Sequence, residues 1–210
     1  IYLKEEVWAE HLIRKLEPFQ YFLEVAAQSN GDIINTANIA RDVGVNDKTV
    51  AEYFSILEDT LIGFHLHSFK GSIRKKLLQK PKFYYFDVGV ARALRKHLSL
   101  KLEPQSYEYE KVFEHFIILE IHKLVQYFYP DYTLSYIRTS DSLEIDLVVE
   151  RPGLKTLFIE IKSGSEIKDQ SLKHLITLEK NDAANSEYIC LSQIKIAEKL
   201  AQLKKRDKEC

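Results

Sequence analysis

The sequence predicts a mixed α+β fold in two parts. The first part is a helical N-terminal domain that ends in a β-hairpin, because two short helical patterns meet at Gly44 and two apolar strand patterns follow them. The second part has the element order αβββαβ, read from a long helical pattern, three strand patterns, a helix and a last strand. With 45% hydrophobic and 29% charged residues, the 210-residue chain has the composition of a globular protein of one or two domains.

The first 30 residues contain two helical patterns. An amphipathic pattern over residues 4–17 is interrupted by Pro18, because proline removes a helix hydrogen bond. A second pattern covers residues 19–27 and stops before Gly31, a residue typical of a helix C-terminus. We expect residues 1–30 to form N-terminal helices.

A helix-turn-helix pattern comes next. Thr36 is the expected N-cap of a short helix that runs to Asp42, and Gly44 supplies the turn. Asn46 or Asp47 then caps a second helix. Its apolar residues share one face: Val50, Phe54 and Leu57.

Two strand patterns, over residues 61–69 and 82–86, flank a basic stretch and predict a hairpin, or wing. The helix over residues 19–27, the two helices of the helix-turn-helix and the hairpin together make a winged helix. Its first helix thus lies within residues 1–30, and the rest of it is expected over residues 31–100, with a further helix that begins after Asp87. Residues 101–108, which have little periodicity, are the expected linker. The aromatic residues of the second strand are expected in the core: Phe83, Tyr84, Tyr85 and Phe86.

The C-terminal domain is expected over residues 109–206, with a frayed tail at 207–210. The strand order predicts an antiparallel meander followed by a crossover to a further strand, in a mixed sheet covered by helices. The predicted elements are a helix (110–128), three strands (132–138, 143–150 and 155–162), a helix (167–179), a strand (187–191) and a last helix (194–204).

The strongest chemical signal lies in the segments LEIDLVVE and FIEIKSG. Residues two apart on a strand share a face, so Glu160 and Lys162 point the same way. Glu144 and Asp146 likewise share a face of the preceding strand. If the two strands pair through the turn at Gly153, Asp146 lies close to Glu160.

Two adjacent carboxylates repel each other unless a proton or a cation lies between them. Hard cations take oxygen ligands, so we expect Asp146 and Glu160 to hold Mg²⁺ or Mn²⁺. Lys162 is placed to orient a nucleophile or to stabilise developing negative charge. The alternative is that these three residues form a salt bridge on a solvated sheet face.

This arrangement resembles the PD-(D/E)XK nuclease superfamily, whose signature is an Asp on one strand and Glu/Asp-x-Lys on the next. Asp146 and Glu160-x-Lys162 match it. The resemblance implies a restriction-endonuclease-like domain and a catalytic set of Glu114, Asp146, Glu160 and Lys162. Glu114, from the helix before the sheet, is the implied third residue of the metal site, and Glu110 is a weaker candidate.

A second resemblance covers nearly the whole chain and includes the segments FLEVAAQSNGDIINTANIARDVGVNDKTV and KFYYFDVGVARAL. These are similar to the C-terminal region of a prokaryotic AAA+-type ATPase family, in which a winged helix and a PD-(D/E)XK-like domain of unknown function follow the ATPase domain. None of the seven glycines precedes a lysine, so the chain has no P-loop. Any ATP site therefore belongs to a missing N-terminal domain, which agrees with a chain that begins at Ile1 and contains no Met.

DNA is the expected partner of the winged helix, through a local patch, because the net charge is only −1. The expected recognition helix is mostly acidic, although Lys48, Thr49 and Tyr53 are placed to reach a groove. The basic stretch is a better phosphate contact, and the alternatives are a solvated loop or a surface that docks on the acidic second half. Its basic residues are Lys70, Arg74, Lys75, Lys76, Lys80 and Lys82.

Histidine and cysteine give weaker signals. His65 and His67 share a strand face without an evident third ligand, and His115 and His122 are expected at a surface or an interface. The two cysteines form no zinc-like cluster, and neither a signal peptide nor a membrane span is evident. These features favour the cytoplasm.

These patterns predict a C-terminal DNA-processing module of an AAA+-type ATPase. Its second domain is a candidate metal-dependent DNA endonuclease, a phosphodiester hydrolase that uses Mg²⁺ or Mn²⁺. The expected partners are DNA and the chain's own N-terminal ATPase domain, with no membrane. The alternative is a non-catalytic DNA- or partner-binding regulatory module with a degenerate nuclease fold. A transcription regulator would need a basic recognition helix, which is not evident.

Overall fold

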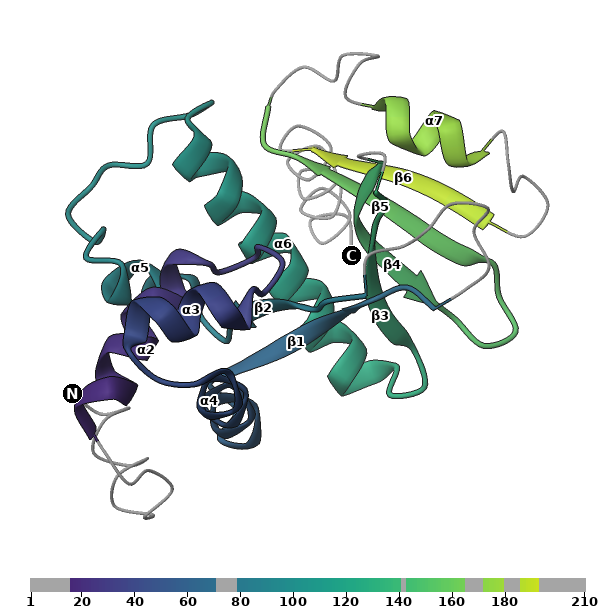
Figure 1. Ribbon diagram of the computed structural model, residues 1–210. Coiled ribbons are helices and arrows are strands. Elements are labelled where there is room, and N and C mark those ends of the chain that lie inside the picture. The colour runs from purple at the N-terminus through teal and green to yellow at the C-terminus, as the bar shows by residue number, and fades with distance from the viewer. Residues whose placement is uncertain (1–15, 71–78, 141–142, 165–171, 180–185, 193–210) are drawn as a thin grey trace. The chain divides into compact units, whose positions relative to one another are not determined.

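The computed structural model describes residues 16–70, 79–140, 143–164, 172–179 and 186–192 (Figure 1). The chain divides into two compact units. The first unit comprises residues 1–67 and 80–101, and the second comprises residues 68–79 and 102–210. Three predicted helices lie wholly or partly outside the described residues. The helix predicted over 194–204 lies outside them completely. Of the helix predicted over 4–17 only residues 16 and 17 are described, and the helix predicted over 167–179 is described from residue 172.

The first unit contains three consecutive helices: α2 (Leu16–Gln28), α3 (Thr36–Val43) and α4 (Asp47–Asp59). Pro18 lies in the first turn of α2, so the predicted helix start at Phe19 is wrong. Proline is tolerated there because the first backbone N–H groups of a helix have no partner within the helix.

Capping residues define where the two helices of the helix-turn-helix begin and where the first of them ends. Asn35, not the predicted Thr36, caps α3, because its extended backbone lets the side chain accept from the Asn38 N–H at 3.3 Å. Gly44 ends α3 with a φ of +76°, a value that glycine adopts without strain. Asn46 caps α4 by accepting from the Thr49 N–H at 2.8 Å, as one of the two predicted caps.

Strands β1 (Gly63–Ser68) and β2 (Lys82–Tyr85) pair antiparallel, with Gly63 opposite Tyr85. The helix α5 (Val88–Leu94) follows and is capped by Asp87, as predicted. Three of the four aromatic residues predicted in the core are buried, but Phe86 is 43% exposed because it lies beyond the last residue of β2.

Aromatic rings form the centre of the first unit's core. Tyr53 lies edge-on to Phe19, with ring centroids 5.1 Å apart, and Phe22 lies edge-on to Phe54 at 4.9 Å. Edge-to-face pairs of this kind add to the free energy gained by burying the rings. Because Tyr53 is 7% exposed, the expectation that it reaches a DNA groove is wrong.

The second unit has the observed element order αβββαβ. The elements are α6 (Tyr107–Phe128), β3 (Thr133–Arg138), β4 (Glu144–Glu150), β5 (Thr156–Lys162), α7 (Lys173–Glu179) and β6 (Ser186–Ser192). Strands β3, β4 and β5 pair antiparallel, and β6 pairs parallel with β5. The predicted mixed α+β class and the mixed sheet are therefore confirmed.

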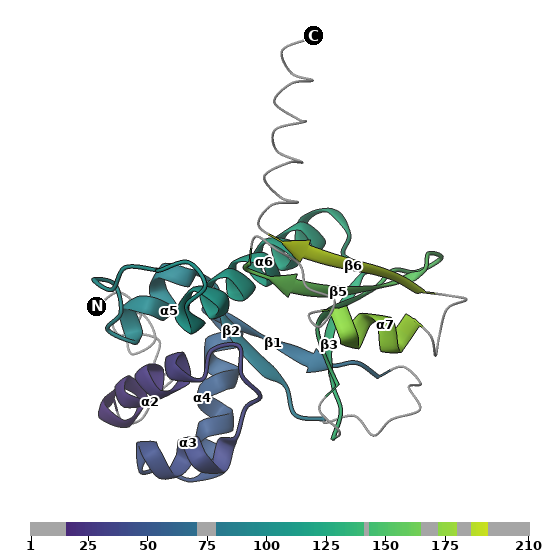
Figure 2. The same cartoon turned by 90° about the horizontal axis from the view of Figure 1, so that it is seen from above.

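Helices cover both faces of this sheet, with α6 on one side and α7 on the other (Figure 2). From α7, Leu175 and Leu178 enter a buried apolar cluster with Phe158 of β5. His115 of α6 is 2% exposed, so the prediction that it lies at the surface is wrong, whereas His122 is half-buried.

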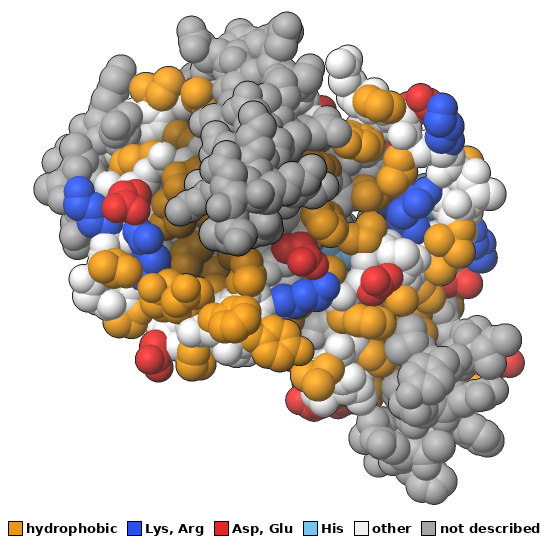
Figure 3. Space-filling model, turned by 180° about the vertical axis from the view of Figure 1, so that it is seen from behind, with side chains coloured by type: hydrophobic (Ala, Val, Ile, Leu, Met, Phe, Trp, Pro, Cys, Tyr) orange, Lys and Arg blue, Asp and Glu red, His pale blue; other side chains and the backbone are white. Residues whose placement is uncertain are grey.

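Helix α6 is apolar on more than one side. Many hydrophobic side chains are exposed on the face of the molecule seen from behind (Figure 3). On α6 the exposed large hydrophobic residues are Tyr107, Phe116, Leu124, Tyr127 and Phe128. No helix in the described ranges has the length and apolar character that a membrane span requires.

Substituting Gly63 tests the packing of the β1–β2 pair. A Cβ atom at this position would lie 2.6 Å from the Tyr84 carbonyl oxygen and would also meet the Phe83 ring. We expect Gly63→Ala to lower the free energy of unfolding by about 1–3 kcal/mol, measured by urea denaturation. Gly89→Ala, at an exposed position in α5, is the matched control and should change it by less than about 1 kcal/mol. Equal effects of the two changes would contradict this packing.

Candidate functional site

Two adjacent strands bring Asp146 and Glu160 together inside the second unit. The register of β4 with β5 includes Leu147 opposite Ile159, so each carboxylate lies one residue beyond this pair. Asp146 is 9% exposed and Glu160 is 5% exposed. Burial of charged groups is costly, so the contacts that they make decide what this site can do.

Each carboxylate has one strong contact. Glu160 Oε1 lies 2.6 Å from Lys162 Nζ, as expected for side chains two apart on a strand. Asp146 Oδ2 accepts a hydrogen bond from the Ile161 N–H at 2.7 Å. The second oxygen of Glu160, Oε2, is buried and has no hydrogen-bond partner among the residues that the structure describes. The salt bridge of the alternative interpretation is therefore present, but its carboxylate is buried rather than solvated.

The pKa of Asp146 is raised to about 8, chiefly by burial and also by the negative charges of Glu114 and Glu160. Lys162 and the Ile161 N–H act in the opposite direction. Burial also raises the pKa of Glu160 above its usual value, against the attraction of Lys162. Burial lowers the pKa of Lys162, but the charges of Asp146 and Glu160 outweigh burial, so that it is raised. The single positive charge of Lys162 therefore does not neutralise the negative charges of Asp146 and Glu160 when both are ionised.

The donor set fits a hard divalent cation. Carboxylate oxygens are the ligands that Mg²⁺ prefers, and it is commonly bound by one or two carboxylates together with waters. Asp146 and Glu160 supply two such groups, one of them with the unpartnered Oε2. The described part of the chain contains no group of three or more His, Cys, Asp or Glu arranged to hold a metal ion. Glu114 lies within electrostatic reach of Asp146, and its role as a third ligand stays a prediction.

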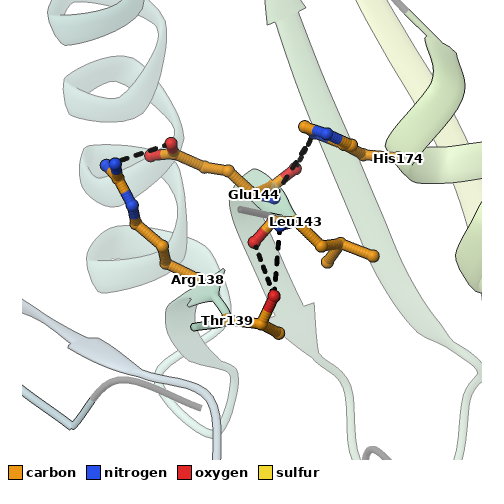
Figure 4. A network of polar contacts seen from close by, with 5 residues as sticks. All are labelled: Arg138, Thr139, Leu143, Glu144 and His174. Atoms are coloured by element: carbon orange, nitrogen blue, oxygen red, sulfur yellow. Dashed lines mark hydrogen bonds and ion pairs between the residues drawn. The ribbon is translucent and has the colours of Figure 1, made fainter. Parts of the chain in front are cut away.

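A polar network adjoins the start of β4 (Figure 4). Arg138 pairs with the Glu144 side chain at 3.2 Å, and His174 Nδ1 lies 2.9 Å from the Glu144 carbonyl oxygen. The charge of His174 also acts on Glu160, in the direction that lowers its pKa. Sequence reasoning missed His174, because it is 30 residues from Glu144 and belongs to no motif.

The predicted DNA contacts divide into exposed, buried and undescribed residues. Lys48 is exposed on α4 and Thr49 is half-buried. Lys70 and Lys80 are exposed, but Lys82 is 3% exposed in β2, so its predicted place in a basic surface is wrong. The other three residues of the wing lie outside the described residues: Arg74, Lys75 and Lys76.

The histidine pair on β1 has a structural partner. His65 Nδ1 lies 2.9 Å from Glu58 Oε2, and Glu58 Oε1 accepts from the His65 backbone N–H at 3.0 Å. Burial raises the pKa of Glu58, but hydrogen bonds and charge from His65 outweigh burial and lower it. The His65 and His67 rings are 6.0 Å apart. His65 therefore joins α4 to β1.

The chain is thus a mixed α+β protein with a buried cluster of carboxylates and a lysine in its second unit. It belongs to the family described as Domain of unknown function (DUF8612), whose model matches residues 1–106. Residues 109–204 match Domain of unknown function (DUF4143), and DUF4143 domains are associated with AAA-type ATPases. The expected relationship to an ATPase family is confirmed to this extent. No curated protein and no solved structure matched the chain.

The raised pKa of Asp146 predicts a pH dependence of stability. Between pH 4 and about 8, folded Asp146 keeps a proton that the unfolded chain has lost. The free energy of unfolding should therefore fall as pH rises through this range, by up to about 1.4 kcal/mol per pH unit. Asp146→Asn should make this slope clearly shallower, measured by urea denaturation from pH 5 to 8, and the slope that remains belongs to Glu160, whose pKa is also raised.

The control is Asp131→Asn, which changes an exposed carboxylate of the same unit. This variant should keep the slope of the unchanged protein. A slope in Asp146→Asn as steep as that of the unchanged protein would show that Asp146 is not the group that binds the extra proton.

Proposed function

We propose that the chain is the C-terminal DNA-processing module of an AAA+-type ATPase, with a metal-dependent nuclease-like domain joined to a winged helix. The observation that carries this proposal is the buried pair Asp146 and Glu160 on adjacent strands, with Lys162 at 2.6 Å from Glu160. Strongly shifted pKa values at a buried carboxylate cluster favour a functional site over a purely structural one.

The second unit supports a restriction-endonuclease-like fold. Its element order is αβββαβ, and the acidic residue and the Glu-x-Lys sequence lie on neighbouring strands β4 and β5. Glu114 comes from α6, the helix that precedes the sheet, and its charge reaches Asp146. These positions agree with the residue set that the resemblance implies.

In this proposal Asp146 and Glu160 hold Mg²⁺ or Mn²⁺, and Glu114 completes the site directly or through water. A divalent cation supplies Lewis-acid chemistry at water and at a phosphoryl oxygen when it is bound. Lys162 keeps a positive charge beside Glu160, because the neighbouring carboxylates raise its pKa. That charge orients an attacking water and offsets the negative charge that develops during phosphodiester hydrolysis.

The first unit supports a winged helix that contacts DNA through its wing. Helices α2, α3 and α4 precede the antiparallel strands β1 and β2. Lys80 of the first unit and Lys70, which belongs to the second unit, are exposed at the two ends of residues 71–78, where the sequence places further basic residues. Such lysines contact phosphates and position a duplex without reading its sequence.

A second candidate function is a non-catalytic binding or regulatory module, with the ATPase domain as the partner. The acidic surface of α4 favours this candidate, because it opposes phosphate contact. Its exposed charged residues are Asp47, Lys48, Glu52, Glu58 and Asp59.

The nuclease proposal predicts cleavage of plasmid, linear or branched DNA in Mg²⁺ or Mn²⁺ and none in EDTA. Asp146→Asn and Lys162→Met should each lower the cleavage rate on the order of 100-fold or more, while urea denaturation shows a folded protein. Asp131→Asn should cleave at the unchanged rate. Cleavage in EDTA, or full activity of Asp146→Asn, would contradict the assigned site. A protein that neither cleaves DNA nor binds Mn²⁺ at millimolar concentration would favour the non-catalytic module.

The wing proposal predicts a salt-dependent loss of DNA affinity. The double change Lys70→Glu with Lys80→Glu should weaken binding about tenfold and reduce the slope of log K against log salt by about 2, measured by fluorescence anisotropy. Lys155→Glu, at an exposed turn between β4 and β5, is the matched control for added negative charge. Equal losses in both proteins would indicate a non-specific charge effect and not a wing contact.

A further inference from the structure

Side chains replace backbone hydrogen bonds where β4 approaches the candidate site. Strands β4 and β5 are paired at three positions, which are Leu147–Ile159, Val148–Phe158 and Val149–Leu157. Further along β5, the Ile161 N–H donates to the Asp146 carboxylate at 2.7 Å. The position of Asp146 therefore depends on how the start of β4 is held.

The backbone of Glu144, at the start of β4, points away from β3. The Thr139 N–H donates to the Leu143 carbonyl at 2.9 Å, and Arg138 is directly opposite Glu144. In an antiparallel pair, successive opposed residues alternate between pairs that are joined by backbone hydrogen bonds and pairs that are not. Because Thr139 and Leu143 are joined in this way, the next pair, Arg138 and Glu144, is not. The N–H and C=O of Glu144 are then directed to the other side of β4.

His174 occupies that side. Its Nδ1 lies 2.9 Å from the Glu144 carbonyl oxygen and 3.3 Å from the Glu144 nitrogen (Figure 4). A protonated Nδ1 donates to the carbonyl, and a bare Nδ1 accepts from the N–H, so either tautomer keeps the ring attached to β4. Leu175 and Leu178 fix α7 in the apolar cluster, and this burial places the imidazole.

We propose that His174 is a positioning residue of the carboxylate site. Its imidazole takes the place of a neighbouring strand as the partner of Glu144, two residues before Asp146. It thereby holds the Asp146 carboxylate against β5, beside Glu160. This inference rests on the proposed metal site, and it adds to that site a residue that contacts neither the cation nor the substrate.

The test compares Mn²⁺ binding of the unchanged protein, His174→Leu and His174→Asn by titration calorimetry. Loss of a residue that orients a metal ligand typically costs 10–100-fold in metal affinity, so we expect His174→Leu to bind Mn²⁺ about 10–100-fold more weakly. The Asn amide reaches the position of Nδ1 and donates to the Glu144 carbonyl, so His174→Asn should stay within about threefold of the unchanged protein.

Thr139→Val is the matched control, because it removes the side-chain bond to the Leu143 N–H at the other side of the same strand end. It should lower stability and leave Mn²⁺ affinity within about threefold. Unchanged affinity in His174→Leu would overturn the proposal, as would equal losses in His174→Leu and His174→Asn.

A second measurement separates this proposal from the proposed function. Without metal, amide hydrogen exchange at Ile161 should be at least about tenfold faster in His174→Leu and unchanged in His174→Asn, because only the first frees the start of β4. If the unchanged protein binds no Mn²⁺, the proposed metal site fails, and this exchange measurement alone decides the role of His174. If His174→Leu does not fold, His174→Gln replaces it, since its longer amide misses the Nδ1 position. Equal exchange in the compared variants would overturn the proposal.

Discussion

Burial of two carboxylates beside a single ammonium is the constraint on which the second unit depends. Transfer of a charged group from water to a protein interior is unfavourable unless partners compensate it. Within the described part of the chain, Asp146 accepts from one backbone N–H and Glu160 pairs with one lysine, while Glu160 Oε2 has no hydrogen-bond partner. The fold thus carries a local destabilisation that the apolar packing of α7 and the sheet must offset.

The acidic residues of α4 in the first unit and those of the candidate site in the second unit differ in their exposure to water. In the first, the acidic residues of α4 stay exposed, and Glu58 is satisfied by both the ring and the backbone of His65. In the second, Asp146 of β4 and Glu160 of β5 are buried, where their charges act on one another. Exposed charges of the first kind are screened by water and salt, whereas the buried cluster responds strongly to protons or a cation.

Local chemistry made much of the fold predictable. Gly44, Asn46 and Asp87 mark helix ends because one residue suffices to define each cap or turn. The errors concern tertiary packing: Lys82 and His115 have polar side chains, and their burial depends on elements distant in the sequence. The site divides in the same way. Strand periodicity predicts the pairing of Glu160 with Lys162, but no spacing rule reaches from Glu144 to His174, since that contact exists only once α7 packs on β4.

The ladder between β5 and β6 continues from Thr156 opposite Ser186 to Lys162 opposite Ser192. Glu160 and Lys162 therefore rest on an unbroken row of backbone hydrogen bonds, whereas Asp146 is attached to β5 by its own carboxylate. Segments with fewer backbone bonds open in smaller and more frequent fluctuations. We therefore expect the Asp146 half of the cluster to open at a lower free energy than the Glu160–Lys162 half. Partial opening of the domain would separate Asp146 from an otherwise intact Glu160–Lys162 half, so the cluster can be dismantled without global unfolding.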